Sequence, residues 1–91
     1  MEQNDGKTYL ERLTDLVTQG RFGAVKDLAN DAVPLAMQQA EAVRERHGEN
    51  DPKYADAVRE VANRLQLAGR SGEAIPLMRT ALQIYERTKK A

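Results

Sequence analysis

The residues that most often carry out enzyme chemistry are sparse in this chain. His47 is its only histidine, Ser71 is its only serine, and it contains no cysteine. The usual sets of zinc ligands therefore cannot be assembled. A catalytic triad would need Ser71 beside His47, but Ser71 lies far along the chain in a predicted inter-helix turn, where it suits a helix N-cap. We expect no catalytic residue, no metal site and no cofactor, and therefore no enzyme.

Phosphate and nucleic-acid recognition are not favoured either. The segment GRSGE (69–73) lacks the Lys-Ser/Thr ending of a phosphate-binding Walker loop. Basic residues gather in two groups: Arg44, Arg46 and His47, and Arg87, Lys89 and Lys90. Both groups fall at predicted helix C-termini, where the helix dipole favours cations. The 14 basic and 14 acidic residues balance, so we expect neither nucleic acid nor a membrane as partner. We also expect no small-molecule substrate, and a nucleic-acid-binding regulator is the least favoured alternative.

The sequence shows no signal for export or membrane insertion. Its start, MEQNDGKTYL, lacks the apolar core of a signal peptide, and no apolar run approaches the length of a membrane span. The lack of cysteine agrees with a reducing compartment. We expect a single cytoplasmic domain over residues 1–91.

Apolar residues recur at helical spacing through four segments, and no segment alternates with the period of a β-strand. The expected helices cover 7–18, 22–46, 53–68 and 73–88. Gly20 ends the first, while Asp51 and Pro52 suit the N-cap and first position of the third. The predicted fold class is all-α, with two stacked antiparallel helix-turn-helix hairpins over about 7–46 and about 52–88.

Two short segments, DAVPL (31–35) and EAIPL (73–77), repeat one pattern and place Pro34 and Pro76 42 residues apart. A proline in a helix interior costs about 3 kcal/mol, because it removes a hydrogen bond and crowds the carbonyl four residues back. For Pro76 that residue is Gly72, at a predicted helix start. For Pro34 it is Asn30, a good N-cap residue. We therefore expect the first hairpin to be lengthened, with a kink or break near Asn30.

The second half of the chain, GENDPKYADAVREVANRLQLAGRSGEAIPLMRTALQIYER (48–87), resembles one unit of the tetratricopeptide repeat (TPR), in the 42-residue variety of kinesin light chains. The matching positions are Pro52, Ala55, Val58, Val61, Ala62, Gly69, Arg70, Glu73, Ala74, Pro76, Leu77, Ala81, Leu82, Ile84, Tyr85 and Glu86. The match is weak over 8–46, where it rests on Gly20, Arg21, Phe22, Ala32, Pro34 and Leu35. The resemblance implies an α-solenoid fragment that serves as a scaffold for protein–protein interaction.

The resemblance also implies a groove lined by the first helix of each hairpin, where asparagines hold a peptide backbone. The two adjacent asparagines typical of the long-period variety are replaced here by Arg59 and Glu60. Arg59, Asn63 and Gln66 still share one helix face, because they are spaced at i, i+4 and i+7. They are our groove candidates, and an ordinary solvated face is the alternative.

The last predicted helix carries two apolar stripes. One consists of Ile75, Met78, Leu82 and Tyr85, and the other of Ala74, Leu77, Ala81 and Ile84. One stripe can pack on the preceding helix, and the other needs a further layer, which two hairpins do not supply. The expected interface residues are Ala74, Leu77, Ala81, Ile84, Met78 and Tyr85.

Several partners could cover this open stripe. A homodimer or larger homo-oligomer is the first candidate, since symmetric dimers are the commonest oligomers. A helix of another protein and a neighbouring repeat of a larger array are the others. The first two helices could also fold back over the stripe. The sequence thus predicts an interaction or assembly module that self-associates through its last helix, or alternatively an adaptor that binds a partner helix or peptide.

Overall fold

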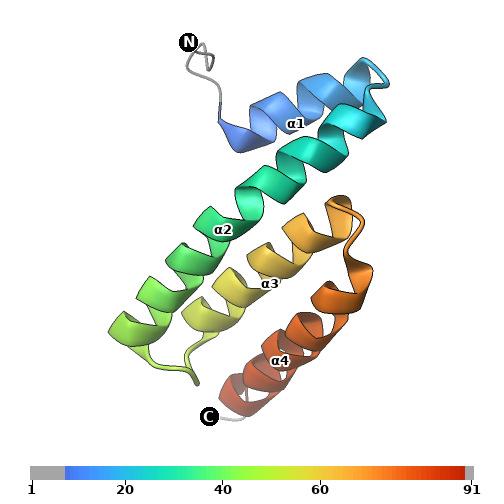
Figure 1. Cartoon of the computed structure of the whole chain (residues 1–91). Coiled ribbons are helices and arrows are strands. Elements are labelled where there is room, and N and C mark those ends of the chain that lie inside the picture. The colour runs from blue at the N-terminus through green and yellow to red at the C-terminus, as the bar shows by residue number, and fades with distance from the viewer. Residues whose placement is uncertain (1–7, 90–91) are drawn as a thin grey trace.

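The computed structural model describes residues 8–89 and contains four helices. In chain order they are α1 (Tyr9–Thr18), α2 (Phe22–His47), α3 (Pro52–Leu67) and α4 (Ser71–Lys89) (Figure 1). Helices make up all regular secondary structure of this part of the chain, so the predicted all-α class is confirmed. Lys7, where the first predicted helix began, and Lys90 of the second basic group lie outside the described residues.

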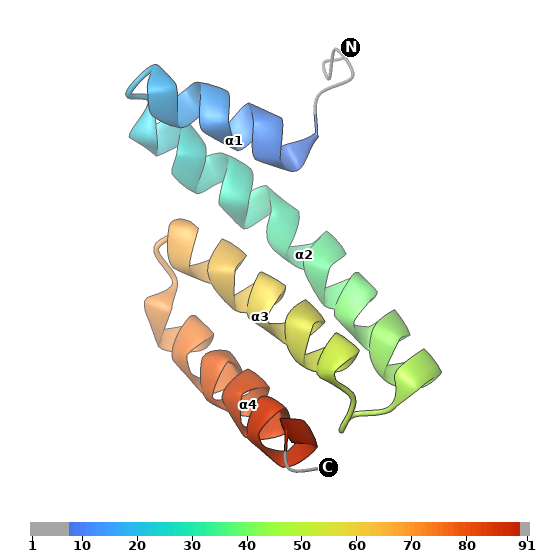
Figure 2. The same cartoon turned by 180° about the vertical axis from the view of Figure 1, so that it is seen from behind.

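Helices α2, α3 and α4 lie side by side in chain order, each antiparallel to the one before, and α1 lies along the N-terminal half of α2 (Figures 1 and 2). The molecule is elongated, with extents of 44 × 26 × 18 Å and a radius of gyration of 14.6 Å. A compact domain of this length would have a radius of about 12 Å. The first two helices therefore do not fold back over α4.

The helix ends follow the sequence signals closely. Thr8 and Glu11 form a capping box at the start of α1, in which the Thr8 hydroxyl accepts from the Glu11 N–H at 3.2 Å. Gly20, with a φ of 71°, turns the chain after α1. The Asp51 carboxylate caps α3 by accepting from the Lys53 N–H at 2.8 Å, and Pro52 is the first helical residue. The predicted roles of Gly20, Asp51 and Pro52 are confirmed.

Helix α2 continues through Pro34 without interruption, so the break considered near Asn30 is not present. One row of buried side chains runs along α2 on both sides of the proline: Val25, Ala29, Val33, Ala36 and Ala40. Val33, just before the proline, and Ala36 and Ala40 after it pack against α3 and hold the helix together. Pro34 and Asn30 are both exposed, so the proline ring lies outside the packed row. Tertiary packing thus outweighs the local cost of the proline.

Helix α4 starts one residue earlier than an N-cap at Ser71 would allow. The N–H groups of Glu73 and Ala74 donate to the carbonyl oxygen of Arg70, at 3.1 and 3.2 Å. Arg70 therefore occupies the cap position, and Ser71 is the first helical residue. The N-cap role predicted for Ser71 is wrong, because Gly69, with a φ of 80°, completes the turn before that residue.

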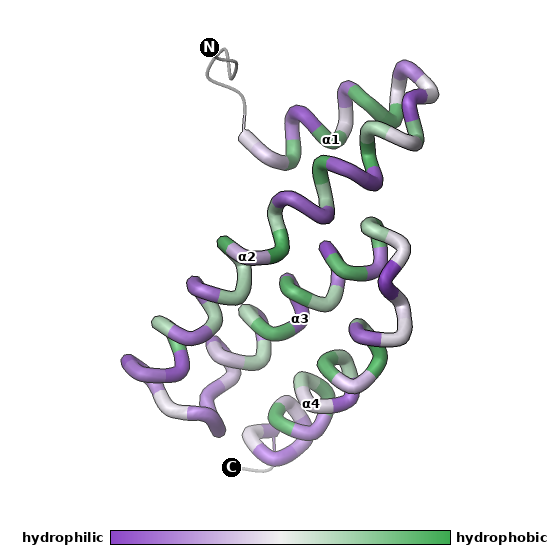
Figure 3. The backbone as a smooth tube through the Cα atoms, in the orientation of Figure 1, coloured by the Kyte–Doolittle hydropathy of each residue, from purple (hydrophilic) through white to green (hydrophobic). Residues whose placement is uncertain are grey.

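The core is a layer of small and branched side chains between α2, α3 and α4. Its larger cluster joins residues of all three helices: Val33, Ala36, Ala40, Val61, Ala62, Leu65 and Ala74. A second cluster near the far end of α3 and α4 consists of Ala55, Val58, Ala81 and Ile84. Figure 3 shows apolar positions recurring between polar ones along every helix, including α4. Alanines at the contact let the helix axes approach closely.

Candidate functional site

The two apolar stripes of α4 are both present, and the stripe that supplied four of the six expected interface residues is the one that faces α3. Ala74, Ala81 and Ile84 are buried against α3, with exposed fractions of 0%, 2% and 1%. Leu77 is half-buried beside them and packs against both core clusters. These four residues, predicted as interface, therefore form the inner stripe. The physical reason is size, since two alanines on α4 meet the alanines of α3 and allow a close contact that larger side chains would prevent.

The uncovered stripe of α4 consists of Ile75, Met78, Leu82 and Tyr85. Ile75 is 48% and Leu82 57% exposed, while Met78 and Tyr85 are half-buried. Met78 and Tyr85 belong to the predicted interface set and remain candidates for an interface. Ile75 and Leu82 were missing from the set, although the spacing already grouped them with Met78 and Tyr85.

A hollow of about 420 Å³ lies between this stripe and α3. It is lined by Arg59, Asn63, Met78, Ala81, Leu82 and Tyr85. Its polar border is organised by Tyr85, whose hydroxyl donates a hydrogen bond to the Asp56 carboxylate. The Arg59 guanidinium lies 5.9 Å from the centre of the Tyr85 ring. The hydrogen bond to Asp56, then burial and the negative charge of Asp56, raise the pKa of Tyr85, and the Arg59 charge opposes them.

The three groove candidates lie on one exposed side of α3, as predicted from their spacing. Arg59 and Asn63 border the hollow beside α4. Asn63 and Gln66 border a second hollow, of about 490 Å³, on the side facing α1. Asn63 therefore lies between the two hollows, with Arg59 beside one of them and Gln66 beside the other. The strip was predicted, whereas the hollows on either side of it were not.

The second hollow lies between α1 and α3, and its lining is apolar with a polar border. The lining residues are Tyr9, Leu10, Leu13, Glu60, Asn63, Arg64, Gln66 and Leu67. Leu10 and Leu67 are 67% and 44% exposed. This is the position that the resemblance assigns to a peptide groove, but its most exposed side chains are apolar.

Arg64 joins three helices and was not anticipated from the sequence. From α3, its Nη1 donates to the Ala32 carbonyl oxygen of α2 at 3.1 Å, and its Nε donates to Glu60 at 3.1 Å. Its guanidinium also lies 4.4 Å from the centre of the Tyr9 ring of α1. A long cationic side chain at the edge of an apolar stripe gives no sequence signal for such a role, because its partners come from other helices.

The Tyr9 hydroxyl is buried beside Arg64 and has no hydrogen-bond partner in residues 8–89. Burial raises the pKa of Tyr9, because the ionised phenolate would lose its hydration. The Arg64 charge acts in the opposite direction, and the Glu60 charge adds to the increase. Tyr9 is thus the anchor of α1 on α3, with one polar atom left unsatisfied.

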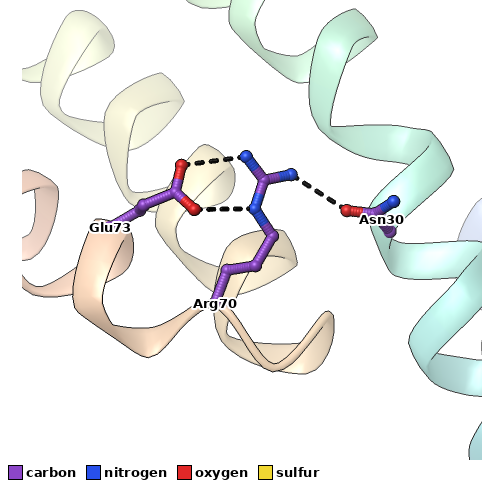
Figure 4. Close-up of polar contacts among 3 residues, drawn as sticks. All are labelled: Asn30, Arg70 and Glu73. Atoms are coloured by element: carbon purple, nitrogen blue, oxygen red, sulfur yellow. Dashed lines mark hydrogen bonds and ion pairs between the residues drawn. The ribbon is translucent and has the colours of Figure 1, made fainter.

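Arg70 links the turn before α4 to α2 (Figure 4). Its Nε and Nη2 donate to the two carboxylate oxygens of Glu73, both at 2.8 Å, and its Nη1 donates to the Asn30 side-chain oxygen at 2.9 Å. The hydrogen bond from Arg70 lowers the pKa of Glu73. Asn30, considered as a helix N-cap, instead contributes a side-chain contact from the middle of α2.

The residues considered for chemistry are not brought together. His47 lies exposed at the end of α2, and Ser71 lies exposed at the start of α4. Within the described residues, no three His, Cys, Asp or Glu side chains are placed to hold a metal ion. None of the helices in this part of the chain is both long and apolar enough to cross a membrane.

Comparisons with protein-family models, with curated proteins and with solved structures found no match to this chain. Among the surfaces described above, the uncovered stripe of α4 combines exposed apolar side chains with an adjoining hollow.

Proposed function

We propose that the chain is a non-catalytic protein–protein interaction module of the TPR type that self-associates through the uncovered stripe of α4. The observation that carries this proposal is the division of α4 into a buried side and an apolar exposed side. Ile75 and Leu82 remain about half exposed on the side away from α3. The proposed location is the cytoplasm, because a chain without cysteine does not need an oxidising compartment to form disulfides.

The energetic argument concerns the apolar surface that association would remove from water. Full burial of a leucine, isoleucine or methionine side chain is worth about 1.5–3 kcal/mol. Because Ile75 and Leu82 are about half exposed, covering each would contribute about 1 kcal/mol per copy. The hollow beside Met78 and Tyr85 offers room for side chains of the second copy.

The first experiment is the solution mass of the full chain, by light scattering behind a sizing column, over a range of concentrations. We expect a dimer or larger species whose fraction rises with concentration. Leu82→Asp should shift the association at least roughly tenfold towards monomer, since a tenfold change needs only about 1.4 kcal/mol. The matched control is Gln83→Asp, which adds the same charge at the next, outward-facing position.

Two outcomes of the mass measurement would overturn the proposal. A chain that stays monomeric at every concentration would show that the α4 stripe does not bind a second copy. Equal masses for Leu82→Asp and the wild-type oligomer would show that the copies meet elsewhere. Thermal unfolding followed by circular dichroism should leave both variants folded, because neither residue is buried.

A second candidate function is favoured by the hollow between α1 and α3. Its 490 Å³ volume and its exposed Leu10 and Leu67 suit an apolar segment of a different protein, with Asn63 and Gln66 at the border. The chain would then act as an adaptor. This candidate takes precedence if the wild-type chain is a monomer. It predicts that Leu67→Asp, rather than Leu82→Asp, abolishes partner binding.

A further inference from the structure

The uncovered stripe of α4 has the same spacing when it is read from either end. Its members Ile75, Met78, Leu82 and Tyr85 are separated by three, four and three residues. The next positions outward at the same spacing are Ser71 and Lys89, both exposed and polar. The stripe is therefore an apolar centre with a polar end on each side, and its midpoint lies at residue 80.

We propose that α4 pairs with α4 of a second copy in antiparallel orientation, about a two-fold axis that passes α4 level with residue 80. This inference rests on the proposed self-association and specifies how the second copy sits. The symmetric spacing then aligns all four positions, so that Met78 faces Leu82 of the other copy and Ile75 faces Tyr85. Each contact occurs twice, as a two-fold interface requires.

The charges at the two ends of α4 favour this orientation over a parallel one. The first turn of α4 carries Glu73, and the last turn carries Arg87 and Lys89. Antiparallel pairing keeps the basic C-terminal ends of the two copies apart, while Glu73 of the first turn is already paired with Arg70 of its own copy. Parallel pairing would bring the two basic ends together, and it would also align the helix dipoles unfavourably.

The side of the stripe away from α3 supplies a further pair of complementary charges. Arg79 and Glu86 are both exposed there, seven residues apart and therefore on one helix face. In the antiparallel pair, Arg79 and Glu86 of the other copy are offset along the helix by about 7.5 Å, which these long side chains can span. The two Arg79 side chains are the only like charges that the described part of α4 places close to the axis, and Glu86 of the opposite copy lies within reach of each.

Cysteine cross-linking tests the orientation directly, because the natural chain has no cysteine. Ser71→Cys and Lys89→Cys place a thiol at either end of the stripe, at exposed positions. The two positions are 18 residues apart on one helix, or about 27 Å, which is beyond the reach of a short bismaleimide. Either variant alone should therefore give no cross-linked product, whereas a mixture of the two should give a covalent dimer.

The double variant Ser71→Cys/Lys89→Cys sharpens the test. In the proposed geometry both thiols of one copy face the thiols of a single partner, so the product stops at a closed dimer. Adding Leu82→Asp to this double variant should abolish the cross-link. Light scattering before cross-linking should give the wild-type mass for each cysteine variant.

The contrary outcomes separate this inference from the proposed function. Cross-linking of either single variant with itself would show a parallel pair. A ladder of trimers and larger products from the double variant would show head-to-tail stacking. No cross-link in a dimer that Leu82→Asp still dissociates would show that the two stripes meet in another register. Each of these overturns the antiparallel geometry and leaves self-association standing, whereas a wild-type monomer overturns both.

Discussion

The two hairpins of this chain share one architecture but differ in how tightly their helices pack. In the second hairpin, α3 buries five side chains and α4 buries three, including Ile84 at 1% exposure. In the first hairpin, none of the described α1 residues is buried. Helix α1 is stabilised locally by its capping box, and it is linked to α3 by the contact of Tyr9 with Arg64.

The difference shows that side-chain size at the contact, more than apolar content, decides how two helices join. Helices α3 and α4 meet through fully buried alanines, Ala55, Ala62 and Ala74 among them. Helix α1 presents Leu13 and Leu16, which are larger and stay half-buried. Alanine lets backbones approach to a close distance, whereas a short helix with bulky residues lies on its neighbour and leaves its flanks open.

The largest expected effect comes from truncating one apolar side chain in each hairpin. Ile84→Ala should lower the free energy of unfolding by about 2–5 kcal/mol, because it opens a cavity in a fully packed site. Leu16→Ala removes a half-buried side chain of α1 and should cost about 1–2 kcal/mol. Urea unfolding followed by circular dichroism measures both. The comparison fails if Leu16→Ala costs as much as Ile84→Ala.

A charged substitution at the same position tests whether Ile84 belongs to the core or to the interface. Ile84→Asp should unfold the chain, since an unpaired buried charge costs several kcal/mol of a stability of about 5–15 kcal/mol. A protein that stays folded with aspartate at position 84, but becomes monomeric, would return Ile84 to the interface.

The next effect in size concerns the attachment of α1. Arg64→Met keeps an apolar side chain of similar length but removes the hydrogen bonds to Ala32 and Glu60 and the cation above the Tyr9 ring. We expect a loss of about 1–2 kcal/mol. Hydrogen exchange should show faster opening of the α1 amides, while the amides of α3 and α4 keep their protection.

The matched control for this variant is Arg59→Met. Arg59 lies on the same helix, is exposed, and is placed above Tyr85 instead of Tyr9. It should leave the exchange of α1 unchanged. Equal loosening of α1 by both variants would contradict the role of Arg64 as the link between helices.

Most of the fold could be predicted from the sequence, because it depends on local signals. Four helices were predicted from helical periodicity, from Gly20 and from the Asp51–Pro52 pair. Their observed ends lie within a few residues of the predicted ones. The break considered near Asn30 could not be decided locally. It depends on whether side chains on both sides of Pro34 pack on α3, which is a tertiary property.

The candidate site was predicted less well, for two physical reasons. Periodicity separates the stripes of α4 but does not say which one faces α3. The alanines Ala74 and Ala81 were the available signal, since small residues mark a close helix contact. The roles of Arg64 and Arg70 had no signal at all, because each side chain reaches a partner on α2 more than 30 residues away in the chain.

The smallest effects are expected when the hydroxyl group is removed from Tyr9 in the first hairpin or from Tyr85 in the second. Tyr9→Phe removes a buried hydroxyl with no partner in the described residues, so at pH 7 it should be neutral or stabilise by up to about 1 kcal/mol. Tyr85→Phe removes a hydrogen bond to Asp56 and should cost about 0.5 kcal/mol. Urea unfolding at pH 7 should therefore show a lower free energy of unfolding for Tyr85→Phe, and an unchanged or higher one for Tyr9→Phe.

The pH dependence gives the same comparison a second readout. Folding raises the pKa of Tyr9 above its ordinary value of 10.0, mainly through burial. Below pH 10 the phenol is neutral in both states and adds no dependence on pH. Above pH 10 the unfolded chain releases its proton first, so stability falls as the pH rises towards the folded pKa. Tyr9→Phe should make this alkaline loss shallower. If it instead destabilises the chain at pH 7 as much as Tyr85→Phe does, the Tyr9 hydroxyl must form a bond in solution, and α1 must be held more firmly than its packing indicates.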